Sequence, residues 1–320
     1  MEGAGHVPVL VGRVTALLAP ALTGQGAVLI DATLGRAGHA RALLEACPGL
    51  LLIGIDADLA AIEAARGLLA PYSDRVVLVH ARYDEIPAIV GRQDRGRQHQ
   101  IMGLLFDLGV SSPQLDDAER GFAYAREAPL DMRMDRTADR TAADIVNGYP
   151  AAELARVLRD YGEERFARRI ADALVRERAY EPITSTQRLS AIVKDAIPAA
   201  TRRTGGNPAK RTFQALRIEV NDELGTLRRA LPAALDVLAV GGRVVVLAYH
   251  SLEDRIVKRE LVHRSRDQAP PGLPVTPAHA AAQFRLLTRG AERPDAEEVT
   301  ANPRAASARL RAAERINQAA

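Results

Sequence analysis

The stretch at residues 105–116 reads LFDLGVSSPQLD. An apolar run that begins at Ile101 ends here in the carboxylate of Asp107, and a turn-forming Gly-Val-Ser-Ser-Pro segment follows. In an open parallel sheet, ligands bind just beyond the carboxyl ends of the strands. A strand that ends in Asp107 and a Ser-Ser-Pro turn therefore indicates a ligand site. An ordinary strand-to-loop exit with solvated polar residues would have the same sequence, so other segments must decide between the two readings.

The same pattern, an apolar run that ends in an acid, occurs twice earlier in the chain. Residues 27–31 read AVLID and residues 50–56 read LLLIGID. Segments of helical composition follow each run, at residues 40–46 and 57–70. Short apolar strands that alternate with helices are typical of βαβ units with a buried parallel sheet. The sequence therefore predicts an α/β protein with a Rossmann-like sheet.

The loop after the first of these runs suggests which ligand the sheet binds. Gly35 and Gly38 would let the backbone approach a ligand at a helix N-terminus, although Gly35-x-Ala37-x-x-Ala40 matches only half of the dinucleotide pattern. Asp56, at the end of the next strand, suits a ribose diol, and Asp31 suits a cationic amino-acid group. S-adenosylmethionine has both groups. A tight turn without any ligand is the alternative.

The rest of the chain predicts a helical insertion followed by the remainder of the sheet. Residues 75–80 form a third strand, residues 87–100 form a polar loop, and no strand-like run occurs between residues 118 and 204. We expect three helices there, with Ser185 or Thr186 capping the third. The later expected elements are helices at 207–223 and 227–240, a strand at 243–249, and a closing antiparallel pair at 284–287 and 308–310. The expected domains are 1–117 and 205–320 for the sheet and 118–204 for an inserted all-helical domain.

Five segments, in one order along the chain, resemble a known family. They are DATLGRAGH at 31–39, DLGVSSPQLD at 107–116, PLDMRMD at 129–135, RTFQALRI at 211–218 and HSLEDR at 250–255. Together they resemble the RsmH (MraW) family of bacterial ribosomal RNA methyltransferases, from about His6 to Ile316. The resemblance implies a class I S-adenosylmethionine-dependent methyltransferase sheet. It also implies methylation of N4 of a cytosine in the decoding region of 16S ribosomal RNA.

The resemblance also implies the residues of the cofactor site. These are Ala37, Gly38, His39, Asp56, Tyr83, Asp107 and Gln114. Tyr83 would lie near the adenine, although it could instead be a core residue, and His39 would contribute its backbone at the helix start. Ala37 stands where we expect the family to have glycine, so a positive φ there would strain the loop.

Ser112 is the catalytic candidate, because related amino-methyltransferases place a small polar or acidic residue beside a proline after the fourth strand. The lone pair of a cytosine amino group is delocalised into the ring. Acceptors for its N–H groups would favour the nucleophilic form and help to remove a proton. Both serines of the turn could instead satisfy backbone groups of the turn.

The segment from Thr201 to Arg217 contains basic side chains and no acid. Phosphate neutralisation with one stacking aromatic, Phe213, would suit single-stranded RNA, and a solvated basic helix is the alternative. The substrate-binding candidates are Arg202, Arg203, Lys210, Arg211, Gln214, Arg217 and His250. The target cytosine must leave any stack to reach the cofactor.

Composition limits the remaining choices. The 320 residues carry a net charge of only +3, which is a weak indication of an anionic partner. Cys47 is the only cysteine and the seven histidines lack metal-ligand spacing, so we expect neither a disulfide nor a metal site. We expect a cytoplasmic protein, since neither a secretory signal nor an apolar run of membrane-spanning length is present.

The expected partner is 16S ribosomal RNA or the small ribosomal subunit, with no membrane and no metal; a homodimer is compatible with the sequence. Two other functions stay open at this stage. A nicotinamide-dependent oxidoreductase would need a hydride-transfer site, which the sequence does not offer. An RNA-binding assembly factor could retain the fold without the activity.

Overall fold

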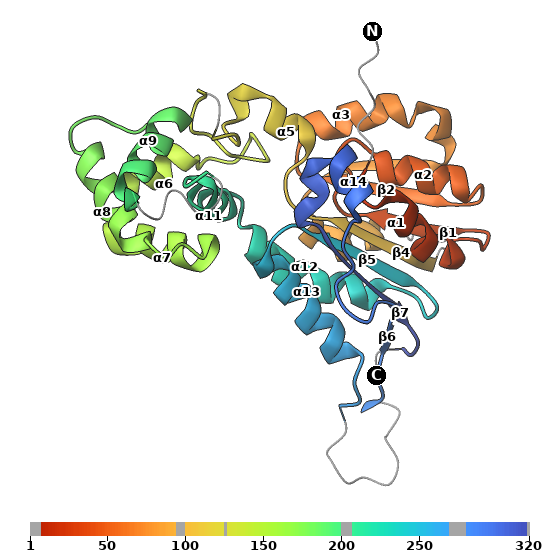
Figure 1. The fold of residues 1–320 in the computed structure, drawn as a ribbon. Coiled ribbons are helices and arrows are strands. Elements are labelled where there is room, and N and C mark those ends of the chain that lie inside the picture. Colours follow the sequence, from red (N-terminus) through yellow and green to blue (C-terminus); the bar gives the residue numbers. More distant parts are fainter. Residues whose placement is uncertain (1–7, 94–99, 125–126, 200–206, 269–279, 319–320) are drawn as a thin grey trace. The chain divides into compact units, whose positions relative to one another are not determined.

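The computed structural model describes residues 8–93, 100–124, 127–199, 207–268 and 280–318 (Figure 1). The chain forms two compact units. The sheet unit combines Met1–Gly109 with Thr226–Ala320, and the helical unit is Val110–Gly225.

The sheet unit is built on a seven-stranded sheet with the strand order β3-β2-β1-β4-β5-β7-β6. All pairs from β3 to β5 are parallel, and β7 pairs in antiparallel fashion with both β5 and β6. The strands are β1 (Ala27–Asp31), β2 (Leu51–Asp56), β3 (Val76–His80), β4 (Gln100–Asp107), β5 (Arg243–Ala248), β6 (Phe284–Leu286) and β7 (Arg309–Arg315). This arrangement confirms the expected α/β fold with a Rossmann-like sheet. The expected closing pair is also confirmed, although Phe284 pairs with Arg315 rather than with residues 308–310.

Helices cover both faces of this sheet, because alternate strand residues point to opposite sides. Ile30 and Phe106 belong to one apolar core, and Leu29 and Leu105 belong to the other. The first core is completed by α4 (Ile86–Gln93), α12 (Glu223–Val237) and α13 (Ser251–Arg264). The second is completed by α1 (Val11–Leu18), α2 (Gly38–Ala46) and α3 (Leu59–Leu68).

The remaining elements of the sheet unit are short. They are η1 (Ala19–Ala21), η2 (Ala70–Arg75), η3 (Tyr83–Glu85), α14 (Ala296–Ala301) and η6 (Pro303–Ser307). Helix α4 lies where we expected a polar loop, because Ile86 and Ile89 are buried one turn apart and give this segment an apolar face. Among the described residues, no helix has both the length and the apolar character that a membrane span requires.

The helical unit contains α5 (Ser112–Asp116), η4 (Ala118–Arg120), α6 (Ala142–Gly148), α7 (Ala151–Gly162), α8 (Ala167–Arg178), α9 (Thr186–Ala196) and α11 (Lys210–Asn221). Its described residues contain no strand beyond an isolated bridge between Pro129 and Ser185. The Ser185 side chain caps α9 by accepting a hydrogen bond from the backbone N–H of Arg188 at 3.2 Å. The end of α9 before Pro198 is also as expected.

The helical unit is longer at both ends than the expected insertion at 118–204. Helix α11, which we assigned to the sheet domain, packs in the helical core through Phe213, Ala215 and Leu216. It also approaches α7 so closely that a Cβ on Gly162 would lie 2.7 Å from the carbonyl oxygen of Arg211. The boundary therefore falls within the first turn of α12 rather than before α11.

Candidate active site

The carboxyl ends of β1, β2 and β4 place three carboxylates at one edge of the sheet. Asp31, Asp56 and Asp107 are the last residues of their strands. In the parallel ladders, Asp31 is aligned with Gly54 of β2 and with Leu105 of β4. The strands are neighbours and run in the same direction, so the three acids gather at the edge where open parallel sheets bind ligands.

In the loop between β1 and α2, Ala37 has a positive φ, the conformation that strains a residue other than glycine. This residue has φ 57° and ψ 23°, is fully buried, and precedes the first residue of α2. A left-handed conformation costs a non-glycine residue about 1–2 kcal/mol. Gly38 needs its small size instead, because a Cβ there would lie 2.4 Å from Cγ of Pro8.

Asp56 joins this loop to the end of β2. Its Oδ2 accepts a hydrogen bond from the backbone N–H of Gly35 at 2.8 Å, and its Oδ1 accepts one from Asp58 at 2.8 Å. Burial raises the pKa of the Asp56 carboxyl, while the two backbone N–H groups act in the opposite direction. Each oxygen retains a lone pair, so the contact with a ribose stays a prediction that this geometry permits.

His39 and Asp107 face each other at this edge. The His39 side chain is 6% exposed, and neither ring nitrogen has a hydrogen-bond partner among the described residues. Its Nε2 lies 3.6 Å from Oδ2 of Asp107, which is too long for a hydrogen bond. Buried polar atoms are normally satisfied, so a bound polar group fits this position. A ligand with carboxylate, amino and hydroxyl groups, such as S-adenosylmethionine, is chemically suited to these residues.

Asp31 is the most deeply buried of the three acids. The residue is 1% exposed, and its Oδ1 accepts a hydrogen bond from the backbone N–H of Thr33 at 3.2 Å. Burial raises the pKa of Asp31 to about 7, and the nearby His39 partly offsets that rise. The site therefore contains a carboxyl group that changes its charge near neutral pH.

Tyr249, which directly follows β5, was not among the candidates from the sequence. Its hydroxyl donates a hydrogen bond to Oδ1 of Asp107 at 2.7 Å. Burial and the neighbouring carboxylate of Asp107 hold the pKa of this phenol far above its usual range. The available signal was the position of Tyr249 at the end of the expected strand at 243–249.

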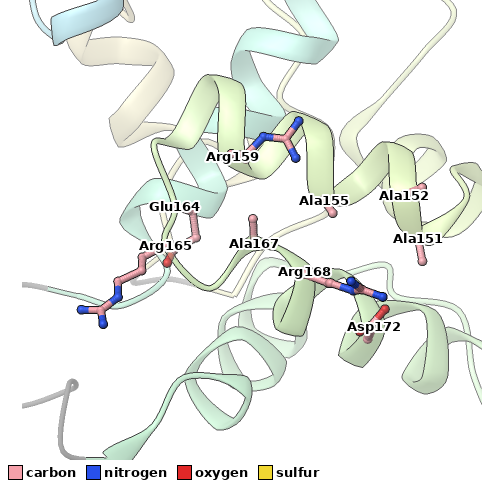
Figure 2. A pocket seen from close by; sticks show the side chains of 9 residues that line it. All are labelled: Ala151, Ala152, Ala155, Arg159, Glu164, Arg165, Ala167, Arg168 and Asp172. Atoms are coloured by element: carbon pink, nitrogen blue, oxygen red, sulfur yellow. The ribbon is translucent and has the colours of Figure 1, made fainter.

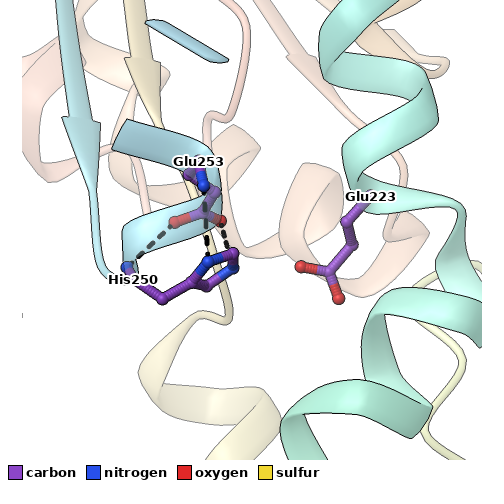
Figure 3. Close-up of side chains that lie close together, drawn as sticks. All are labelled: Glu223, His250 and Glu253. Carbon is purple, nitrogen blue, oxygen red and sulfur yellow. Dashed lines mark hydrogen bonds and ion pairs between the residues drawn. The ribbon is translucent and has the colours of Figure 1, made fainter. Parts of the chain in front are cut away.

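His250 is the N-cap of α13 and is held by Glu253 (Figure 3). The Glu253 N–H donates to Nδ1 of His250 at 3.4 Å, and Nε2 of His250 lies 3.2 Å from Oε1 of Glu253. The second carboxylate oxygen of Glu253 accepts hydrogen bonds from the backbone N–H groups of Tyr249 and His250, at 2.9 and 3.3 Å. This reciprocal cap gives His250 a structural role, and its contact with substrate stays a prediction.

Tyr83 belongs to the short helix η3 and makes a core contact. Its ring meets that of Phe106 edge to face, with centroids 5.7 Å apart and planes at 86°. Tyr83 therefore makes the core contact that the alternative expected. A contact between its ring and adenine stays a prediction.

Gln114 and Ser112 belong to the helical unit. Gln114 is 6% exposed, and its Oε1 accepts a hydrogen bond from the backbone N–H of Ser111 at 3.0 Å. Ser112 is the first residue of α5. Their roles in cofactor binding and catalysis stay predictions.

The structure divides the basic segment into residues with different surroundings. Arg202 and Arg203 lie outside the described residues. Phe213 is 4% exposed and packs edge to face on Tyr124 with centroids 5.9 Å apart, so the expectation that it stacks on a base is wrong. The reason is that Phe213 lies on the face of α11 that forms the helical core.

The polar side chains of α11 differ in their exposure and in the protein groups to which they bind. Arg217 makes a two-point ion pair with Glu223 at 2.8 and 2.9 Å, with both side chains largely buried, so a phosphate would have to displace that carboxylate. Gln214 donates to the carbonyl of Tyr161 at 2.9 Å. Lys210 and Arg211 lie exposed in the first turn, where Arg211 donates to the carbonyl of Glu163 at 3.1 Å.

Arginines also line a hollow of about 680 Å³ in the helical unit, between α7 and α8 (Figure 2). It is lined by Ala151, Ala152, Ala155, Arg159, Glu164, Arg165, Ala167, Arg168 and Asp172. The arginine side chains are exposed, whereas Glu164 is 6% exposed and accepts a hydrogen bond from the N–H of Phe166 at 2.8 Å. The hollow is therefore lined by small apolar residues together with three arginines and two acids.

A comparison with known families shows to which family the chain belongs. The sequence model of the MraW methylase family matches residues 3–316. The chain belongs to this family. The match covers residues of both units.

Individual relatives agree over nearly the whole chain. A protein of Thermobifida fusca named ribosomal RNA small subunit methyltransferase H is 64% identical over 313 residues, which are 98% of this chain and 94% of that one. A protein of Frankia alni with the same name is 61% identical over 311 residues, 97% of this chain and 95% of that one. A third, of Saccharopolyspora erythraea, is 61% identical over 316 residues, 98% and 94% of the two chains.

Proposed function

We propose that this protein uses S-adenosylmethionine to methylate N4 of a cytosine in 16S ribosomal RNA of the small ribosomal subunit. The observation that carries the proposal is the group of Asp31, Asp56 and Asp107 beside the loop into α2, in a chain of the MraW methylase family. Because the substrate is ribosomal RNA, we propose the cytoplasm as the site of action.

The sheet unit would hold the cofactor. Ala37, Gly38 and His39 contribute the start of α2, where the backbone N–H groups favour an anionic group such as the methionine carboxylate. Asp56 would accept hydrogen bonds from the ribose hydroxyls, and Tyr83 would border the adenine. Asp107 would complete the contacts of the sheet unit, and Gln114 of the helical unit is a further candidate that the family resemblance implies. When bound, S-adenosylmethionine supplies an electrophilic methyl group on its sulfonium.

The protein's contribution to the reaction is mainly alignment. Methyl transfer is an in-line displacement, so the cytosine N4 must lie behind the S–methyl bond, and fixing that geometry removes much of the entropic barrier. We propose that Ser112 and the carbonyl groups beside it accept hydrogen bonds from the N4 amino group. These acceptors would localise the nitrogen lone pair and help to remove a proton after the transfer.

The helical unit would bind the RNA. Lys210 and Arg211 present exposed positive charge in the first turn of α11, and Arg202 and Arg203 precede them in sequence. Arg159, Arg165 and Arg168 add exposed guanidinium groups around the hollow of α7 and α8. Guanidinium groups suit phosphate through their planar fork, so this unit offers several sites for a single-stranded backbone.

The position of the only cysteine separates N4 methylation from methylation at C5, which would need a thiolate nucleophile. Cys47 is 3% exposed at the end of α2, and burial raises the pKa of its thiol. A buried cysteine in apolar surroundings is inert. The Cys47→Ala variant should therefore keep full methyltransferase activity.

Product analysis tests the proposal. Purified protein is incubated with S-adenosylmethionine and small ribosomal subunits that lack the modification, and the digested RNA is examined by mass spectrometry. We expect N4-methylcytidine from both the wild type and Cys47→Ala. A product of 5-methylcytidine or methylated adenosine would contradict the proposal.

A further inference from the structure

Tyr249 connects the ends of two neighbouring strands at the site. It follows β5, which pairs with β4, and its hydroxyl donates to Oδ1 of Asp107, the last residue of β4, at 2.7 Å. A phenol that donates to a carboxylate at this distance makes a charge-assisted hydrogen bond, one of the stronger kinds in proteins. The orientation of the Asp107 carboxylate therefore depends directly on Tyr249.

The Tyr249 ring is itself held in place. It packs against the apolar cluster of Val9, Ala305 and Ala308. Gly109, at φ 96°, lies so close that a Cβ there would be 3.4 Å from Cδ2 of the ring. The backbone N–H of Tyr249 donates to Oε2 of Glu253 at 2.9 Å. Because the ring and the backbone are both fixed, the hydroxyl is presented to Asp107 in one position.

The other contacts of Asp107 show in which direction the Tyr249 hydroxyl orients the Asp107 carboxylate. The backbone N–H of Asp107 donates to Oγ1 of Thr33 at 2.6 Å, which fixes the main chain. Its Oδ2 lies 3.6 Å from Nε2 of His39, beside the loop proposed to hold the cofactor. With Oδ1 held by Tyr249, the carboxylate turns Oδ2 towards the side where His39 lies.

We infer that Tyr249 is a positioning residue for cofactor binding, whose hydroxyl orients the Asp107 carboxylate for its contact with the cofactor. The inference rests on the proposed function, because it takes Asp107 to be a cofactor ligand. Burial and Asp107 both raise the pKa of the phenol, so Tyr249 stays a protonated donor at the pH of an assay. The Tyr249 hydroxyl therefore keeps its proton, and can donate its hydrogen bond to Asp107, in ordinary buffers.

The Tyr249→Phe variant tests this inference, because it removes the hydroxyl and keeps the ring in its apolar contacts. We expect the dissociation constant of S-adenosylmethionine and its KM to rise about tenfold, the effect of one lost hydrogen bond to a charged group. The KM for RNA and the kcat at saturating cofactor should stay unchanged. The matched control is Tyr72→Phe, which removes a hydroxyl that lies 3.3 Å from Glu45 on the surface and should leave cofactor affinity unchanged.

A double-mutant cycle separates positioning from a general structural effect. In an Asp107→Ala background, Tyr249→Phe should cause no further loss of cofactor affinity, because the hydroxyl then has no carboxylate to orient. An equal loss in both backgrounds would overturn the inference, as would wild-type affinity in the Tyr249→Phe protein. A wild-type protein that binds no S-adenosylmethionine would instead overturn the proposed function itself.

Discussion

Asp31 should make the stability of the protein depend on pH in a direction opposite to that of most carboxylates. Burial raises the pKa of Asp31 from its ordinary value of 3.8 to about 7. Between these two values the folded state binds a proton that the unfolded state has released, so the free energy of unfolding falls as the pH rises. The full change from 3.8 to about 7 corresponds to about 4 kcal/mol.

The Asp31→Asn variant removes this dependence while keeping an oxygen that can accept the hydrogen bond from Thr33. Urea unfolding of both proteins, at several pH values from about 5 to about 8, measures the difference in their free energies of unfolding. We expect the wild type to lose about 2–3 kcal/mol relative to the variant over this range. Other titrating groups are common to both proteins, and their effect largely cancels in the difference.

Asp139→Asn controls for the chemical change itself, because Asp139 is exposed. At a single neutral pH it should unfold within about 0.5 kcal/mol of the wild type. A difference between wild type and Asp31→Asn that stays constant with pH would refute the argument, since it would mean that Asp31 titrates alike in the folded and unfolded chains.

Further substitutions test the loop, the ribose contact and the RNA surface. Gly38→Ala should destabilise the fold by about 1–3 kcal/mol, because its Cβ would overlap a packed proline ring. Gly67→Ala, in open space on α3, should instead stabilise it by about 0.5–1 kcal/mol; equal thermal shifts for the two would count against the packing argument. Asp56→Asn should weaken cofactor binding about ten- to a hundredfold by calorimetry, and unchanged affinity would remove this residue from the ribose. Charge reversal of Lys210 and Arg211 should lower the salt dependence of RNA binding by about 0.7 in slope for each lost phosphate contact, with cofactor affinity intact; an unchanged slope would exclude this turn of α11 from the RNA surface.

The sheet and its acids could be predicted from sequence because the signals are local. A buried parallel strand is a continuous apolar run, and an acid at its end is visible in the sequence itself. The strands that end at Asp31, Asp56 and Asp107 are therefore found within a residue or two of their expected bounds. Ala37 has the positive φ that we considered because glycine was expected at that position.

Other features depend on tertiary contacts that a local pattern does not contain. The basic segment around α11 looked like an RNA-binding strip, but one face of that helix is the core of the helical unit, which buries Phe213 and pairs Arg217 with Glu223. For the same reason α11 was assigned to the wrong side of the domain boundary. The hydrogen bond from Tyr249 to Asp107 joins residues 142 positions apart, and only the pairing of β4 with β5 brings them together.

The most direct test of the central claim is the modification of ribosomal RNA in cells. A bacterial strain that lacks its own member of the family is complemented with this chain or with its Asp107→Ala variant, and nucleosides from purified 16S ribosomal RNA are quantified by mass spectrometry. We predict that the wild type restores methylation at cytosine N4 and that the Asp107→Ala variant restores little or none. Ribosomal RNA without N4-methylated cytidine in the cells that express the wild-type protein would contradict the proposed function.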